Sequence, residues 1–138
     1  MQTKSVHPIA GYPEEARIAY VSLLGELCYI DHQFDDSERK ILEDQLENLE
    51  ISDAGRAKVY AAIFDLGDSC RDSILEGIKN LNSSDLRYTL VADLFIMALA
   101  NNFISAEEQD YIFKIGRELD ISDEKINTIK AVQFSLWQ

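Results

Sequence analysis

Acidic side chains gather in the stretch 29–38, which contains Asp31, Asp35, Asp36 and Glu38. Carboxylates crowded into one turn of chain repel each other unless water or a cation lies between them, and hard divalent cations prefer oxygen ligands. This stretch therefore predicts a divalent-metal site. Helix capping is the competing interpretation, because Asp35-x-x-Glu38 has the form of a capping box.

A second stretch has a related pattern, with Asn101, Ser105 and Glu108 in place of the earlier acidic residues. Ser105-x-x-Glu108 is also a capping box, so caps account for both glutamates without any ligand. If the fold brings the two loops together, Asn101 and Glu108 could complete the metal site. The predicted ligands are then Asp31, Asp35, Glu38, Asn101 and Glu108.

Other kinds of site fit these residues poorly. An EF-hand loop starting at Asp31 would need a glycine at position 36 and a glutamate at position 42, where this chain has Asp36 and Leu42. Zinc favours His and Cys, and His32 is the only such residue nearby. The chain has no Glu-x-x-His pair for a di-iron site and no glycine-rich phosphate loop. It also has no Cys–His pairing or serine with a base at a recognisable spacing, so we expect no enzymatic activity.

Two further carboxylates, Glu26 and Asp93, are the only charges inside two long apolar runs. A carboxylate in a protein core is costly unless it is paired. Each of them either faces solvent at the flank of its helix, or pairs with an arginine or contributes to an inward site.

The elements that carry these residues are all expected to be helices. Apolar residues recur at helical spacing and predict seven helices, over about 13–30, 36–49, 53–66, 69–80, 85–100, 106–119 and 123–136. No segment has the pattern of a strand, so the fold class is all-α. In the last helix we expect Ile126, Ile129 and Val132 to face inward.

An internal repeat appears when the chain is compared with itself after a shift of about 70 positions. Arg17 then matches Arg87, and Leu49 matches Leu119; the wider set includes Val21 with Val91, Glu38 with Glu108, and Ala61 with Ala131. We predict one domain over 1–138, with three-helix repeats over 13–66 and 84–136 and an inserted helix over 69–80. The most apolar helices, 13–30 and 85–100, should pack at the centre, related by pseudo-symmetry.

Composition limits the partners. The 138-residue chain is 46% hydrophobic and 28% charged, with a formal net charge of −12. A charge of that sign repels nucleic acid and anionic membranes, whereas cations and basic protein surfaces stay compatible. The charge is equally explained by solubility alone.

Three features of the sequence bear on localisation. Cys28 and Cys70 lie far apart, no signal peptide is evident, and the longest apolar run, 94–100, is too short to cross a bilayer. We therefore expect a cytoplasmic protein.

In the first copy of the repeated loop, Asp31 is followed by the apolar Phe34 and then by Glu38, and this pattern resembles that of the TerB-like tellurite-resistance family. Asp31, Phe34 and Glu38 match that family's Ala-Asp-Gly stretch, its apolar residue and its glutamate, and the resemblance covers about residue 13 to the C-terminus. His32 stands where the family's glycine usually lies, and Asn101 with Asn102 replaces the second Asp-Gly pair. The resemblance implies a cytoplasmic helical protein tied to tellurite or related stress resistance, whose acidic cluster binds divalent metal.

Two functions follow as hypotheses. The first is a non-enzymatic stress or resistance domain that binds a divalent metal ion through its acidic inter-helix loop. The alternative is a protein-interaction module that docks a basic partner on its acidic surface. Phe134, Leu136 and Trp137 either close the core or form a contact between two copies of the chain, so a homo-oligomer is compatible with the sequence.

Overall fold

The computed structural model describes residues 8–29, 36–64, 68–99 and 104–137. In these residues the chain forms one short 3-10 helix, seven α-helices and no strand. The elements are η1 Pro8–Gly11, α1 Glu14–Tyr29, α2 Asp36–Asn48, α3 Asp53–Phe64, α4 Asp68–Lys79, α5 Ser84–Ala98, α6 Ala106–Glu118 and α7 Asp123–Trp137. The all-α prediction is confirmed.

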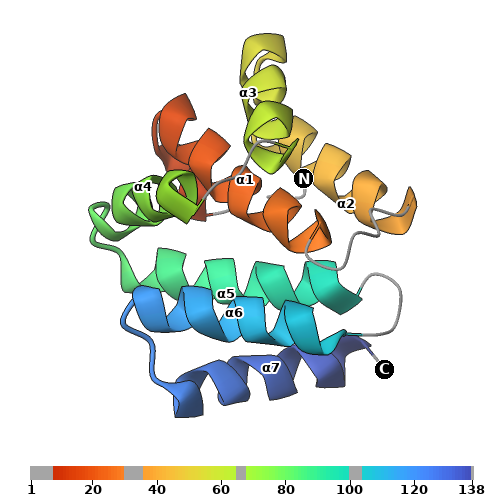
Figure 1. The fold of residues 1–138 in the computed structure, drawn as a ribbon, viewed down its shortest axis with the longest axis vertical. Helices are drawn as coiled ribbons and strands as arrows, with labels where there is room; N and C mark the ends of the chain where they lie inside the picture. The colour runs from red at the N-terminus through yellow and green to blue at the C-terminus, as the bar shows by residue number, and fades with distance from the viewer. Residues whose placement is uncertain (1–7, 30–35, 65–67, 100–103, 138) are drawn as a thin grey trace, which may run out of the picture.

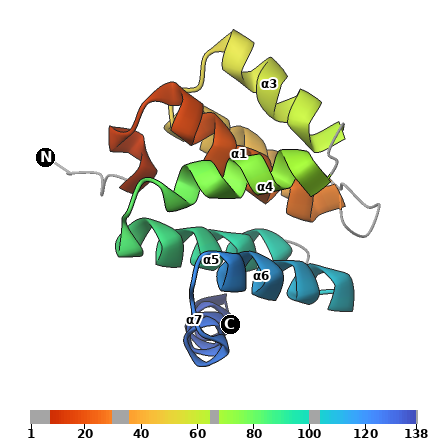
Figure 2. The same cartoon turned by 60° about the vertical axis from the view of Figure 1, so that its left-hand side comes forward.

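Helices α1 and α5 form the centre of the molecule, as their apolar sequences predict. Helix α1 contacts α2, α3, α4, α5 and α6, and α5 contacts α1, α2, α6 and α7. Figures 1 and 2 show α3 at one edge and α7 at the opposite edge, with α1 and α5 between them. These two helices supply more of the core than any other pair, including Tyr20, Leu24, Leu27, Leu90, Leu94 and Phe95, all at most 1% exposed.

Helix ends use the same local chemistry in both halves of the chain. After α2, Glu50 adopts a positive φ of 54°, and after α6 Asp120 adopts 63°. Each left-handed residue is followed by a backbone N–H that bonds back into the helix, from Ile51 to the Leu46 carbonyl at 3.0 Å and from Ile121 to the Gly116 carbonyl at 2.9 Å. This pattern satisfies carbonyl groups that the end of a helix leaves without partners.

An arginine from each central helix binds one of these ends. The Arg17 guanidinium donates to the Leu49 carbonyl at 2.5 Å, and the Arg87 guanidinium donates to the Leu119 carbonyl at 3.1 Å. The two contacts are equivalent in the repeat, because a shift of 70 positions relates Arg17 to Arg87 and Leu49 to Leu119. The recurrence is local, and the pseudo-symmetric packing of the whole repeats stays a prediction.

Helix α1 approaches α3 closely at Gly25. A methyl group added at Gly25 would lie 2.1 Å from Cδ1 and 2.6 Å from Cγ1 of Ile63, so only glycine leaves room for that side chain. Gly116 on α6 plays a similar part, since a Cβ there would lie 2.6 Å from Cδ1 of Ile126 on α7. These contacts set how closely the third helix of each repeat can pack.

Several boundaries and one core position differ from the predictions. Helix ends agree to within about two residues where they are described, although the predicted ends at Ile30, Leu66 and Ala100 lie outside the described residues. The 3-10 helix η1 was not predicted, and its Ile9 is fully buried. The inward position of Val132 is wrong: Ile126 is buried and Ile129 is half-buried, but Val132 is 49% exposed.

Candidate functional site

The two predicted glutamate ligands occupy the first turns of two helices. Glu38 lies in the first turn of α2 and Glu108 in the first turn of α6, and each side chain is only 2% exposed. In Figure 1 the starts of α2 and α6 lie on the same side of the molecule as the last turns of α1 and α5. The other three predicted ligands, Asp31, Asp35 and Asn101, lie outside the described residues.

The predicted capping box at α6 is confirmed. The Glu108 backbone N–H donates to Ser105 Oγ at 3.0 Å, and the Ser105 backbone N–H donates to Glu108 Oε1 at 2.9 Å. This reciprocal pair satisfies two N–H groups at the start of the helix. Capping therefore explains why Glu108 turns back toward Ser105. The matching box at α2 would use Asp35, which lies outside the described residues.

A third buried carboxylate lies near the same end of the molecule. Glu26 is in the last turn of α1 and is 4% exposed, so of the two interpretations of this residue the solvent-facing one is wrong. Its burial follows from the position of α1, which has neighbouring helices on several sides. Its neighbours in the sequence, Leu23, Leu24, Leu27 and Cys28, are all buried as well.

Asp93 has a different environment. It is half-buried on α5, and its Oδ2 accepts a 2.5 Å hydrogen bond from the hydroxyl of the fully buried Tyr20 on α1. Burial, and then the charge of Asp93, raises the pKa of Tyr20 well above its usual value. The Tyr20–Asp93 pair therefore joins the two central helices with a neutral phenol.

The chemistry of these donors favours hard cations. Glu26, Glu38 and Glu108 offer only carboxylate oxygens, which suit Mg²⁺, Ca²⁺ or Mn²⁺ better than Zn²⁺. Within the described part of the chain, no three acidic, histidine or cysteine side chains form a group that could hold a metal ion. Glu38 and Glu108 fit such an ion by type, and the other three predicted ligands lie outside the described residues.

The family of the chain can be stated at this point. The family model for tellurite resistance protein TerB matches residues 17–131. The chain belongs to the TerB family. The TerB match spans α1 to α7 and includes both loops and all five predicted ligands. Searches of curated proteins and of solved structures gave no match.

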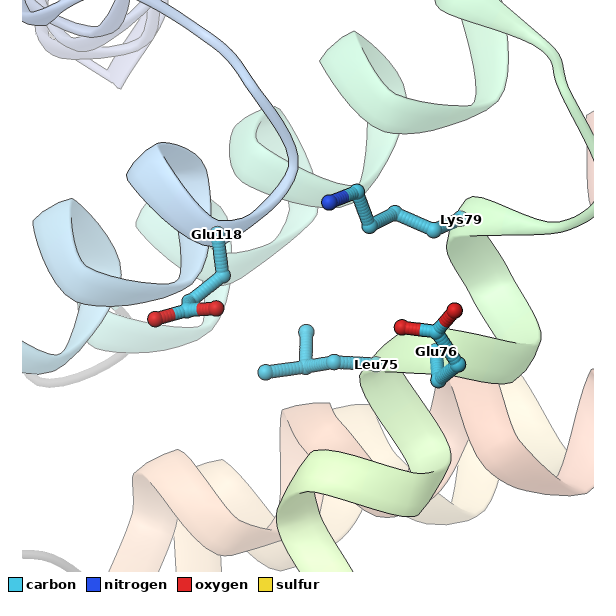
Figure 3. Close-up of a pocket in the computed structure, with 4 residues that line it drawn as sticks. All are labelled: Leu75, Glu76, Lys79 and Glu118. Carbon is cyan, nitrogen blue, oxygen red and sulfur yellow. The ribbon is translucent and has the colours of Figure 1, made fainter.

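A hollow on the surface of this TerB domain lies away from the buried glutamates. It has a volume of about 190 Å³ and is lined by Leu75, Glu76 and Lys79 of α4 and by Glu118, the last residue of α6 (Figure 3). Glu108 lies at the opposite end of α6. The Lys79 ammonium is 3.5 Å from Oδ2 of Asp120, so part of its charge is already balanced. Among the described helices, none is long and apolar enough to cross a membrane.

Proposed function

We propose that this TerB-family protein is a non-enzymatic resistance or stress domain of the cytoplasm that binds a divalent metal ion. The observation that carries the proposal is the burial of Glu38 and Glu108, which occupy matching positions in the two repeats and are each 2% exposed. A glutamate that only caps a helix can do so at the surface. Two buried carboxylates at matching helix starts supply the oxygen donors that a hard divalent cation prefers.

Glu38 and Glu108 would hold the ion together with Asp31, Asp35 and Asn101 of the adjoining loops. Hard oxygen ligands of this kind suit Ca²⁺, Mg²⁺ or Mn²⁺. A bound ion would supply positive charge between the carboxylates and tie the two loops to each other. Glu108 can serve both roles, because Ser105 occupies Oε1 and a carboxylate has two oxygens and several lone pairs.

Thermal unfolding of chelator-stripped protein tests this proposal. We would add Ca²⁺, Mg²⁺, Mn²⁺ and Zn²⁺ in turn to the native chain and to a Glu38→Gln, Glu108→Gln double variant. Glutamine still forms a capping box, so the double variant removes the charges and keeps the caps. An ion at about 100 times its dissociation constant should add roughly 2.7 kcal/mol of stability to the native chain.

A matched control removes two exposed carboxylates in place of the buried pair. Glu76→Gln, Glu118→Gln changes the net charge by the same amount at an exposed site. The proposal predicts that this variant keeps the metal-dependent shift while the buried-pair variant loses it. A shift of equal size in both variants, or no shift with any ion, would assign Glu38 and Glu108 to capping alone.

A second candidate function is docking of a basic protein partner. Asp44, Glu47, Glu50 and Asp53 are all exposed around the end of α2 and the start of α3, and the last turn of α2 has no basic residue. A lysine-rich peptide tests this idea by titration at low and high salt. Binding that weakens with salt and is lost in Asp44→Asn, Glu47→Gln supports docking, whereas salt-insensitive binding contradicts it.

A further inference from the structure

The outer face of α7 is unusual for this chain because it is apolar and exposed. Only three large hydrophobic residues of the described chain are exposed: Tyr88 at 39%, Val132 at 49% and Leu136 at 74%. Two of them are on α7, and Tyr88 adjoins that helix, since the Lys125 ammonium lies 5.7 Å from the centre of its ring. Because Leu136 is 74% exposed, it does not help to close the core.

These residues form one line along the helix. Lys125, Thr128, Val132 and Leu136 are all exposed and are spaced by three, four and four residues, which places them on one side of α7. With Tyr88 at the Lys125 end, they make a continuous strip about 16 Å long. We call Tyr88, Lys125, Thr128, Val132 and Leu136 the α7 stripe. Figure 2 shows α7 at the outer edge of the molecule.

The stripe also differs from its surroundings in charge. The chain has 25 acidic residues and a net charge of −12, yet residues 125–138 contain two lysines and no aspartate or glutamate. The second of these, Lys130, donates to Gln109 at 2.5 Å and lies over the Phe134 ring, so it faces its own domain. In the other repeat, α3 has Lys58 and Ala62 at the positions that match Thr128 and Val132. The exposed Val132 therefore has no counterpart of similar size in α3.

We propose that the α7 stripe binds the same stripe of a second copy of this chain, with the two α7 helices antiparallel and the two-fold axis beside Val132. Two copies of a chain with a charge of −12 repel each other over most of their surface. The stripe lets them meet without bringing carboxylates together. A two-fold axis at Val132 also pairs Thr128 of each copy with Leu136 of the other.

The ends of the stripe complement each other in this arrangement. Lys125 lies seven residues before Val132, so an antiparallel partner places it just past the last turn of the other α7, which ends at Trp137. That turn has no basic residue of its own, and the negative end of a helix dipole favours a cation. Each copy then supplies the lysine that the other copy's helix end lacks.

The area of the contact sets its strength. One helix face against another buries less than the roughly 1,200 Å² of stable complexes, so we expect a dissociation constant on the order of 10⁻⁵–10⁻⁴ M. Salt should strengthen the dimer, because it screens the repulsion between two acidic chains more than it weakens apolar contact. Docking of a basic partner would respond to salt in the opposite direction.

Sedimentation velocity across protein concentrations up to about 1 mM tests the proposal. The native chain, of 15.7 kDa, should approach twice that mass as concentration rises. Val132→Asp should raise the dissociation constant at least about tenfold. Ala61→Asp introduces the same charge at an exposed position of α3 and should leave the dimer unchanged. Circular dichroism of both variants checks that they stay folded.

Disulfide trapping tests the antiparallel geometry separately, in a Cys70→Ser background. Val132→Cys should cross-link two copies because the axis brings these positions together. Leu136→Cys should not, because its two copies would lie about 12 Å apart along the helices, beyond the reach of a disulfide. Cross-linking at both positions would overturn the antiparallel arrangement. A native chain that stays monomeric at every concentration, or a Val132→Asp chain that dimerises normally, would overturn the interface itself.

Discussion

The Tyr20 hydroxyl donates a 2.5 Å hydrogen bond to Oδ2 of Asp93, which joins the two central helices across 73 residues of chain. Tyr20 is fully buried and Asp93 is half-buried. Tyr20→Phe removes this donor and keeps the ring. We expect the free energy of unfolding in urea to fall by about 1–3 kcal/mol. Tyr88→Phe, at an exposed position, is the control and should change it little; equal effects of the two variants would contradict the role of the pair.

A second tyrosine predicts how stability changes at alkaline pH. Tyr60 donates a hydrogen bond to Glu43, and burial, followed by that bond and the charge of Glu43, raises the pKa of Tyr60 to about 12. The unfolded chain releases the phenol proton near pH 10, whereas the folded chain holds it to about pH 12. The unfolded state therefore binds fewer protons in this window, and stability should fall as the pH rises from about 10 to 12.

Denaturant unfolding at several alkaline pH values measures this effect. Tyr60→Phe should reduce the slope of stability against pH between about 10 and 12, because the variant has no proton to release there. Below pH 9 the slopes of the two proteins should agree. An unchanged slope above pH 10 would show that Tyr60 ionises equally easily in both states.

Replacing glycine by alanine should have opposite effects on stability at Gly25, where α1 approaches α3 closely, and at Gly77 on α4, where there is open space. Gly25→Ala places a methyl group against Ile63 and should lower stability by about 1–3 kcal/mol, although alanine is the better helix former. Gly77→Ala has nothing within 4 Å of the new methyl group and should raise stability by up to about 1 kcal/mol. Thermal unfolding of both variants measures the contrast, which fails if Gly25→Ala is also stabilising.

The hydrogen bonds of Arg17 and Arg87 at helix ends predict that the two residues contribute unequally to stability. Arg87 donates to carbonyls at the ends of two helices, Leu119 at 3.1 Å and Lys79 at 3.0 Å, whereas Arg17 binds at the end of α2 alone. Each substitution by methionine should lower the free energy of unfolding by about 1–3 kcal/mol, and more for Arg87. Arg117→Met, which breaks a solvent-exposed ion pair with Asp123, should cost less than either.

The sequence correctly predicted the features that depend only on residues close together in the chain, namely the helices and the capping box of α6. The capping box of Ser105 and Glu108 depends on residues three apart, so spacing alone was enough to find it. The helices followed from the periodicity of apolar residues for the same reason. Val132 shows the limit of this approach. Steps of three residues turn a helix by about 300°, so Ile126, Ile129 and Val132 drift around the axis until the third leaves the buried face.

Features that depend on how the helices pack together could not be predicted from the sequence. Glu26 is buried because several helices cover α1, and its own sequence could not show how many helices would do so. The same limit applies to the metal site. Spacing predicts that Glu38 and Glu108 begin helices, but the distance between their two loops depends on how α2 and α6 pack on α1 and α5. No pattern within either loop determines that packing.

The contact between Tyr111 and Leu23 has a consequence for biosynthesis. The Tyr111 hydroxyl donates a 3.2 Å hydrogen bond to the Leu23 carbonyl, so two buried residues 88 positions apart must meet. A ribosome adds roughly 5–20 residues per second, so α1 emerges several seconds before α5 and α6 can cover it. During that interval the nascent chain exposes one of its two most apolar helices, which makes α1 the segment that molecular chaperones would bind first.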